Sequence, residues 1–228
     1  MNTLKTDSNI YYKNSQIYDN FSQAQDYGDL IIQEISKIVK GDVLDFGCGT
    51  GKIILKLLEK NLDISLTGLD ISENQLDILR NKIPTNKYVN LICYNSNNLP
   101  FTDNTFDFVI SSWVLGTVED NDKRDLILKE LKRILKKNGL LILIENWHND
   151  EFEKIIRGVN LINKIDSYDF WIKKNNFKIY KQLETKFHFK DLITAKEIFS
   201  SIWNKTVAAR IQSNEISHLV RIYILINN

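Results

Sequence analysis

Residues 43–52 read VLDFGCGTGK and place glycines at positions 47, 49 and 51 directly after an apolar run. Glycine allows sharp turns and close approach of a ligand, and a strand that ends before a helix aims free backbone N–H groups and the helix dipole at that ligand. The stretch therefore predicts a strand, a ligand-binding turn and a helix. It is not a dinucleotide G-x-G-x-x-G motif, because Lys52 replaces the last glycine, nor a phosphate loop, because Ile53 follows Lys52.

Strand and helix patterns alternate around this stretch. Apolar residues at helical spacing predict helices at 26–39, 51–60, 72–83 and 122–139, the last closed by Gly139. Apolar or alternating runs predict strands at 42–46, 63–70, 89–95, within 106–115 and at 140–145. Five such alternations are typical of a parallel sheet covered by helices on both faces. Beyond them we expect helices at 150–163, 167–175 and 191–207 and strands at 177–187 and 218–226.

The composition indicates a globular protein. The chain has 228 residues, 43% of them apolar, and its 30 basic and 29 acidic side chains argue against a nucleic-acid partner. Its two cysteines, Cys48 and Cys93, support neither a disulfide framework nor a zinc cluster. No apolar run approaches the ~20 residues of a membrane helix, and the N-terminus lacks the apolar centre of a signal peptide. We therefore expect a cytoplasmic protein without a membrane segment.

Two carboxylates narrow the class of ligand. Asp45 precedes the glycines, where its charge would oppose a pyrophosphate but attract an ammonium group. Asp70 ends the next predicted strand, where a carboxylate can accept hydrogen bonds from two ribose hydroxyls. A nucleoside that carries an ammonium and no pyrophosphate describes S-adenosylmethionine.

The sequence resembles the class I S-adenosylmethionine-dependent methyltransferases of the small-molecule type in four motifs that occur in the family's order. The motifs are hhDxGxGxG at 43–51, the acidic residue in LTGLDIS at Asp70, NSNNLPFTDNTFD at 95–107 and LKKNGLLILIE at 135–145. The resemblance covers residues of roughly 12 to 146. It implies an α/β fold: a Rossmann-like, doubly wound, mostly parallel seven-stranded sheet with helices on both faces and an antiparallel last strand.

The resemblance also implies the cofactor, S-adenosylmethionine, with S-adenosylhomocysteine as product and no metal. The glycines would lie under its methionine part, Asp45 would reach toward the ammonium, Asp70 would bind the ribose, and Asn95 and Ser96 would border the adenine. Asn95 departs from the family's usual Asp, and Gly116 lies where many relatives carry a His. The full predicted cofactor set is Asp45, Gly47, Cys48, Gly49, Gly51, Asp70, Ile71, Asn95, Ser96 and Ser111.

The acceptor should lie at the ends of the fourth and fifth strands, because ligands of open α/β sheets bind outside the carboxyl ends of the strands. Those ends supply Ser111, Ser112, Trp113, Glu145, Trp147 and His148. We identify His148 as the candidate general base, with an ordinary surface histidine as the open alternative. The predicted lid and acceptor residues, each of which could instead fill the core, are Tyr12, Tyr18, Tyr27, Trp113, Trp147 and Trp171.

These features predict one methyltransferase domain over residues 1–228. It comprises a helical cap (1–40), a cofactor-binding core (41–145) and a substrate-side lid with closing strands (146–228). We expect methyl transfer to an oxygen or nitrogen of a small-molecule acceptor by in-line displacement. An RNA or DNA methyltransferase, or a non-catalytic accessory protein that binds S-adenosylmethionine, remains an alternative.

Overall fold

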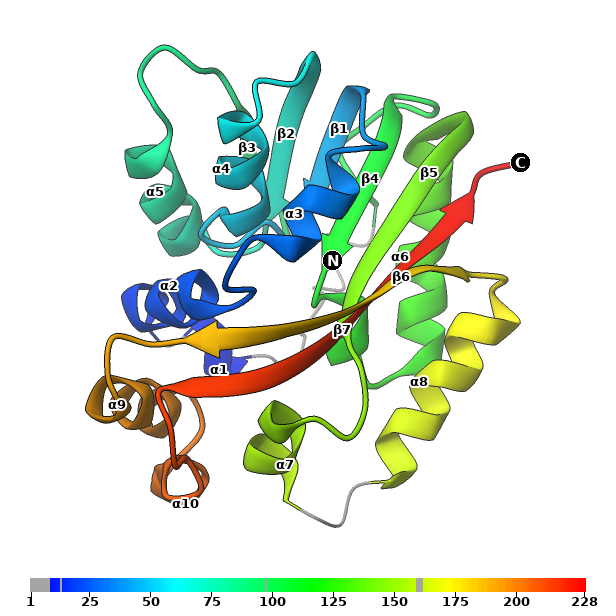
Figure 1. Cartoon of the computed structure of the whole chain (residues 1–228). Helices are drawn as coiled ribbons and strands as arrows, with labels where there is room; N and C mark the ends of the chain where they lie inside the picture. Colours follow the sequence, from blue (N-terminus) through cyan, green and yellow to red (C-terminus); the bar gives the residue numbers. More distant parts are fainter. Residues whose placement is uncertain (1–8, 13, 97, 159–161) are drawn as a thin grey trace.

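The computed structural model describes residues 9–12, 14–96, 98–158 and 162–228, so residues 1–8 and 13 of the predicted cap lie outside the described chain. A seven-stranded sheet of order β3-β2-β1-β4-β5-β7-β6 organises the fold (Figure 1). β7 is antiparallel to both of its neighbours, whereas the pairs among β1 to β5 are parallel. This confirms the predicted fold class. The strands are β1 Gly41–Phe46, β2 Ile64–Asp70, β3 Asn90–Cys93, β4 Phe106–Ser112, β5 Leu135–Asn146, β6 Lys178–His188 and β7 Glu215–Ile226.

Helices bury apolar stripes on both faces of the sheet. On one face lie α3 (Leu30–Ile35), α4 (Lys52–Glu59) and α5 (Glu73–Lys82), whose Ile32, Ile54 and Leu76 share one apolar cluster. On the other lie α6 (Asn121–Ile134) and α8 (Ile162–Lys174), whose Leu131 and Trp171 share a second cluster. Among the helices of the described residues, none combines the length and apolar character needed to cross a lipid bilayer.

A third apolar cluster lies beyond the carboxyl ends of the parallel strands. Figure 1 shows β6 and β7 running on past those ends toward α9 and α10. The cluster joins Phe21 of α2, Phe152 of α7, Phe187 of β6 and Phe199 of α9. It holds a group of helices over the edge of the sheet at which ligands of this architecture bind. These helices are α1 Asn9–Tyr12, α2 Ser15–Ala24, α7 Glu151–Arg157, α9 Leu192–Ile202 and α10 Lys205–Ala208.

Lys52, which stands where a dinucleotide motif needs its last glycine, ties α2 to the core. Its amine is buried and donates to the carbonyl oxygens of Ser22, at 2.9 Å, and Gln25. These carbonyls lie at the C-terminal end of α2, where helix carbonyls lack intrahelical partners. Burial lowers the pKa of Lys52 to about 8. The lysine therefore fastens the N-terminal segment to the start of α4.

Three predicted helices were too long. The helix predicted at 26–39 is confined to α3, because the Asp26 carboxylate accepts the N–H groups of Leu30 and Ile31 and starts the helix there. The helix predicted at 191–207 is divided into α9 and α10, and Asn204 caps the second. The pattern at 150–163 gives α7, which ends at Arg157; residues 159–161 of that prediction lie outside the described chain.

The helix predicted at 122–139 was wrong at its C-terminal end. α6 stops at Ile134, and β5 begins at Leu135 and continues through Gly139. Leu135 pairs with Phe106 of β4, and the register of the two strands shifts between Phe106 and Phe108. The Asn227 side-chain amide donates to the carbonyl oxygen of Leu135 at 2.9 Å. Pairing with distant strands thus overrode the helical spacing.

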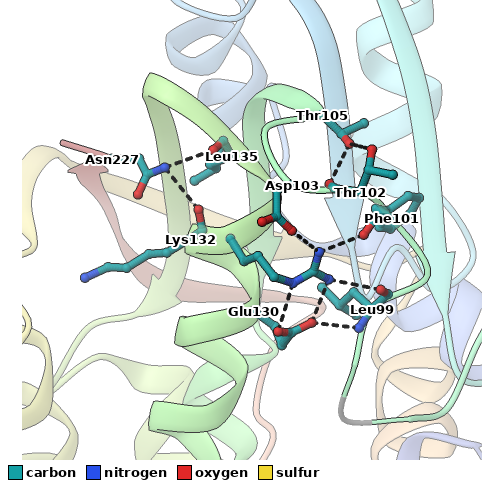
Figure 2. A network of polar contacts seen from close by, with 10 residues as sticks. Leu99, Phe101, Thr102, Asp103, Thr105, Glu130, Lys132, Leu135 and Asn227 are labelled. Atoms are coloured by element: carbon teal, nitrogen blue, oxygen red, sulfur yellow. Dashed lines mark hydrogen bonds and ion pairs between the residues drawn. The ribbon is translucent and has the colours of Figure 1, made fainter.

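The NSNNLPFTDNTFD motif is held by a charged side chain of α6. Arg133 donates to the carbonyl oxygens of Leu99 and Phe101 and to the Asp103 carboxylate, and pairs with Glu130 on its own helix. Figure 2 shows these partners gathered between the loop and the helix. Glu130 in turn accepts the Leu99 N–H at 2.9 Å. Much of this motif therefore holds the loop between β3 and β4 in place.

Candidate active site

The carboxyl ends of β1, β2, β4 and β5 open into a cavity of about 740 Å³. Its walls include the glycine loop, the ends of these strands and side chains from α1, α2, α7 and α8. This volume lies within the range of about 300–1,000 Å³ typical of small-molecule and cofactor sites. The cavity occupies the edge of the sheet at which the sequence places both cofactor and acceptor.

The glycine loop needs glycine because of its backbone shape and its own neighbours. Gly47, Gly49 and Gly51 have φ angles of 77°, 55° and 87°, in the left-handed region that favours glycine. A Cβ on Gly47 would overlap the Val114 side chain, and one on Gly51 would overlap Leu79. Gly47 and Gly49 line the cavity, whereas Gly51 is covered by protein.

The expectation that this loop aims free N–H groups at a ligand was wrong for four of its residues. The N–H groups of Gly47 and Cys48 both donate to the Leu69 carbonyl, at 2.7 and 3.1 Å. Gly49 donates to Asp70 Oδ2 at 2.8 Å, and Gly51 donates to the Cys48 carbonyl. The loop therefore offers close approach to its backbone rather than an anion site, which agrees with the absence of a phosphate motif.

Asp70, which the sequence predicts to bind the ribose, is the last residue of β2. Its side chain lines the cavity, and its two carboxylate oxygens accept the N–H groups of Gly49 and Ser72 at 2.8 and 2.9 Å. Burial raises its pKa, against the effect of these hydrogen bonds. A carboxylate has about four lone-pair positions, so Asp70 retains capacity for hydroxyl donors. The neighbouring Ile71 also lines the cavity.

Asp45 is buried behind the glycine loop. It is 1% exposed, and neither carboxylate oxygen has a hydrogen-bond partner among the described residues. Burial, and then the nearby Asp70 carboxylate, raise its pKa to about 8. A buried carboxylate without a hydrogen-bond partner is unstable as an anion, and a neighbouring cation stabilises it. Asp45 thus fits a ligand with an ammonium group, although its own side chain does not line the cavity.

The other predicted cofactor residues lie in the cavity wall, in the core or at the surface. Ser96 lines the cavity, together with Tyr94, which the motif comparison missed. Asn95 is exposed and does not line it. Cys48 packs in the core beneath the loop, and Ser111 is fully buried in β4. The alternation of side chains along β4 explains this last correction, since the next residue, Ser112, faces the cavity.

A cluster around Glu145 forms another part of the cavity wall. Glu145 is the penultimate residue of β5 and accepts hydrogen bonds from the Tyr168 hydroxyl at 2.8 Å and the Gly116 N–H at 3.0 Å. The Arg124 guanidinium lies 4.7 Å from the centre of the Tyr168 ring. Sequence reasoning placed Glu145 at a strand end but missed Tyr168 and Arg124, because α6 and α8 bring them there from distant parts of the chain.

His148 also lines the cavity, as predicted for a candidate base. Its Nε2 lies 3.0 Å from Asp169 Oδ2, and Asp169 lines the cavity as well. The ring packs 4.0 Å, centre to centre, from that of Trp147, and the Arg221 guanidinium covers the Trp147 ring. Trp147 packs against the His148 ring but does not itself line the cavity.

Three of the six predicted lid and acceptor residues do not line the cavity: Trp147, as described above, Tyr27 and Trp171. Tyr27 is 56% exposed, stacks on His188 and lies outside the cavity. Trp171 is 1% exposed, belongs to the core under α8 and donates its indole N–H to Asp125 at 2.6 Å. The remaining candidates Tyr12, Tyr18 and Trp113 line the cavity, as do the aromatic residues Tyr11, Phe21, Phe152, Tyr168 and Trp203.

Comparison with known proteins agrees with this geometry. Residues 44–143 match the family model of a methyltransferase domain. A demethylmenaquinone methyltransferase of Symbiobacterium thermophilum is 34% identical over 119 residues, which make up 50% of this chain and 45% of the relative. The ubiquinone/menaquinone biosynthesis C-methyltransferase UbiE of Rickettsia prowazekii is 32% identical over 165 residues, or 67% of this chain and 62% of the relative. The chain thus spans about half the length of the curated relatives it matches.

A solved structure extends the likeness beyond the matched segment. A S-adenosylmethionine-dependent methyltransferase of Methanosarcina mazei shares the fold, with a TM-score of 0.52 and 24% identity over 80% of this chain and 91% of that one. The strand order, the glycine loop between β1 and α4, and the acidic end of β2 agree with the motifs in the sequence. The methyltransferase-domain match, the curated relatives and the shared fold together support a class I S-adenosylmethionine-dependent methyltransferase.

Proposed function

We propose that this protein transfers a methyl group from S-adenosylmethionine to a small-molecule acceptor and releases S-adenosylhomocysteine. The observation that carries the proposal is the continuity of the cavity, which runs from Gly49 and Asp70 to Glu145 and His148. One continuous cavity can therefore bring a cofactor and an acceptor together. Alignment of the two reactants is the main contribution that a protein makes to a displacement of this kind.

The cofactor half of the cavity supports this proposal through its donor set. Asp70 would accept hydrogen bonds from the ribose hydroxyls, and Ser96, with Ile71 and Tyr94, would border the adenine. Gly47 and Gly49 would let the methionine part of the cofactor approach the backbone. The Asp45 carboxylate, behind the loop, would balance the positive charge of the cofactor's ammonium group. When bound, the cofactor supplies an electrophilic methyl group on a sulfonium; the residues named here bind and orient it.

For the acceptor we propose a small, partly aromatic molecule. Trp113, Tyr168 and Trp203 provide ring surfaces, and Glu145 and His148 provide polar contacts. We keep oxygen and nitrogen as acceptor atoms and add ring carbon, because the relatives' names describe quinone methylation, in one case at carbon. A hydroquinone related to demethylmenaquinone is therefore a rational first acceptor to test.

Calorimetric titration with S-adenosylmethionine, S-adenosylhomocysteine and NAD tests the cofactor. We expect micromolar binding of the first two and none of NAD. Asp70→Asn should weaken binding, while Asp63→Asn, on the exposed side of the β1–β2 connection, should leave it unchanged. NAD binding, or failure of both adenosyl compounds to bind, would refute the proposed cofactor.

An acceptor screen then tests methyl transfer. Radiolabelled S-adenosylmethionine would be incubated with demethylmenaquinol, simple phenols, aromatic amines and unfractionated tRNA. We expect label in a small-molecule product. Transfer to tRNA would favour the nucleic-acid alternative, and cofactor binding without transfer to any acceptor would favour an accessory role.

A further inference from the structure

Glu145 presents one free carboxylate oxygen at the cavity. The residue is only 4% exposed, yet it belongs to the cavity wall. Oε1 accepts both of its hydrogen bonds, from Tyr168 at 2.8 Å and from Gly116 at 3.0 Å. Oε2 accepts none from any residue that the structure describes. The carboxylate is thus held firmly through one oxygen while the other remains available to a ligand.

The turn after β4 connects this carboxylate with the glycine loop. Val114 fills the space beside Gly47, and Gly116, two residues further on, faces Glu145. A Cβ on Gly116 would lie 2.5 Å from Glu145 Oε2, so any larger residue there would displace the carboxylate. The short 3-10 helix Leu115–Thr117 therefore sets Glu145 beside the loop that we propose holds the methyl donor.

The ionisable groups around Glu145 come from three elements. Tyr168 faces it from α8, Arg124 from α6 and Tyr223 from β7. The Arg124 guanidinium also donates to the carbonyl oxygens of Leu115, at 3.0 Å, and Val118, which fixes it beside the turn. Burial raises the pKa of Glu145 to about 7, against the effects of Tyr168, Gly116 and Arg124. A general base works best when its pKa lies near the working pH.

We propose that Glu145 Oε2 accepts the proton from the O–H or N–H group of the acceptor during methyl transfer. This inference rests on the proposed function. The bond from the acceptor atom to the methyl carbon forms as the carbon–sulfur bond breaks, and the electron pair of the broken bond stays on the neutral sulfur of the thioether. The acceptor's proton passes to Oε2, while Tyr168 and Gly116 keep the carboxyl group oriented through Oε1.

The geometry favours Glu145 over His148 for this step. Glu145 is the last charged residue within β5 and contacts the turn that borders the glycine loop. His148 lies beyond the strand end, where its Nε2 is engaged by Asp169 and its ring packs on Trp147. Its second ring nitrogen still makes it the competing candidate, so the same substitution at His148 belongs in the test.

The test compares the wild-type protein with Glu145→Gln, His148→Gln and the exposed-strand control Glu184→Gln. Glutamine preserves the shape of Glu145 but cannot take a proton. S-adenosylhomocysteine affinity is measured first, because its absence in the wild-type protein would defeat the proposed function itself. With binding intact, methyl transfer is measured with phenol, 1,4-naphthohydroquinone and aniline at pH 7. We expect Glu145→Gln to bind normally and to lose about 10²-fold or more in kcat.

A measurement that needs no acceptor accompanies these assays. Infrared difference spectra of the S-adenosylhomocysteine complex between pH 5 and 9 should contain a protonated carboxyl band that disappears near pH 7. The band should persist in Glu184→Gln and be missing from Glu145→Gln. The proposal is overturned if this carboxyl is still protonated at pH 9, because a protonated carboxyl cannot take the acceptor's proton. It is also overturned if Glu145→Gln transfers methyl groups at the wild-type rate, or if the loss of rate follows His148→Gln instead.

Discussion

Replacing Asp45 with Asn should stabilise the ligand-free protein at neutral pH and alter how its stability depends on pH. Asp45 is 1% exposed, and its carboxyl group has no hydrogen-bond partner in the described chain. Burial and the Asp70 carboxylate raise its pKa from 3.8 to about 8. Asparagine keeps the size of the side chain and removes the titrating group.

The sign and size of the effect follow from proton linkage. Between pH 3.8 and 8 the folded protein holds a proton on Asp45 that the unfolded chain has released. The stability from this raised pKa is fully present below pH 3.8 and is lost as the pH rises through about 8. Each pH unit in that window removes about 1.4 kcal/mol from the free energy of unfolding. The loss between pH 4 and pH 7 is therefore about 4 kcal/mol.

Urea unfolding from pH 4 to pH 8 measures this loss directly. The difference in unfolding free energy between Asp45→Asn and wild type should increase by about 4 kcal/mol from pH 4 to pH 7. Asp63→Asn, which removes an exposed carboxylate, controls for the change in net charge and should show no such slope. A difference that stays constant with pH would refute the reasoning, because it would mean that Asp45 ionises in the folded protein as easily as in the unfolded chain.

Three further substitutions test the loop, the ribose contact and the N-terminal segment. Gly51 has a left-handed φ and a Cβ there would overlap Leu79, so Gly51→Ala should lower the unfolding free energy measured in urea by about 2–4 kcal/mol. Gly28→Ala, with open space around it, should lower the unfolding free energy by about 1 kcal/mol. Equal losses for the two variants would contradict the packing argument. Asp70→Asn should weaken S-adenosylhomocysteine binding by about tenfold or more in calorimetry, and unchanged affinity would remove Asp70 from the site. Lys52→Met should speed proteolysis within residues 14–29, because α2 loses its tie to α4. Cleavage at the wild-type rate would show that the aromatic cluster and the Lys82–Asp19 ion pair hold α2 without Lys52.

Local patterns in the sequence determined the framework of this protein. The alternation of strand and helix, the three glycines and the acidic end of β2 were all readable, because each depends on side-chain periodicity or on the backbone freedom of a few adjacent residues. These features were enough to predict the fold class and the edge of the sheet at which the cavity opens. Trp171 and the start of β5 were misread, because burial and strand pairing are decided by distant residues.

Only the tertiary structure decided which side chains meet in the cavity. Glu145 accepts hydrogen bonds from Tyr168 of α8 and from Gly116 of the turn after β4. His148 pairs with Asp169 of α8. No sequence spacing predicts such partners, since they depend on how helices pack across the sheet. The same packing buries Asp45 without a hydrogen-bond partner among the described residues, and it engages Glu145, in the cavity wall, through Oε1. Proton affinity depends on burial and neighbouring charge, so the chemistry of these carboxyl groups is a property of the folded chain.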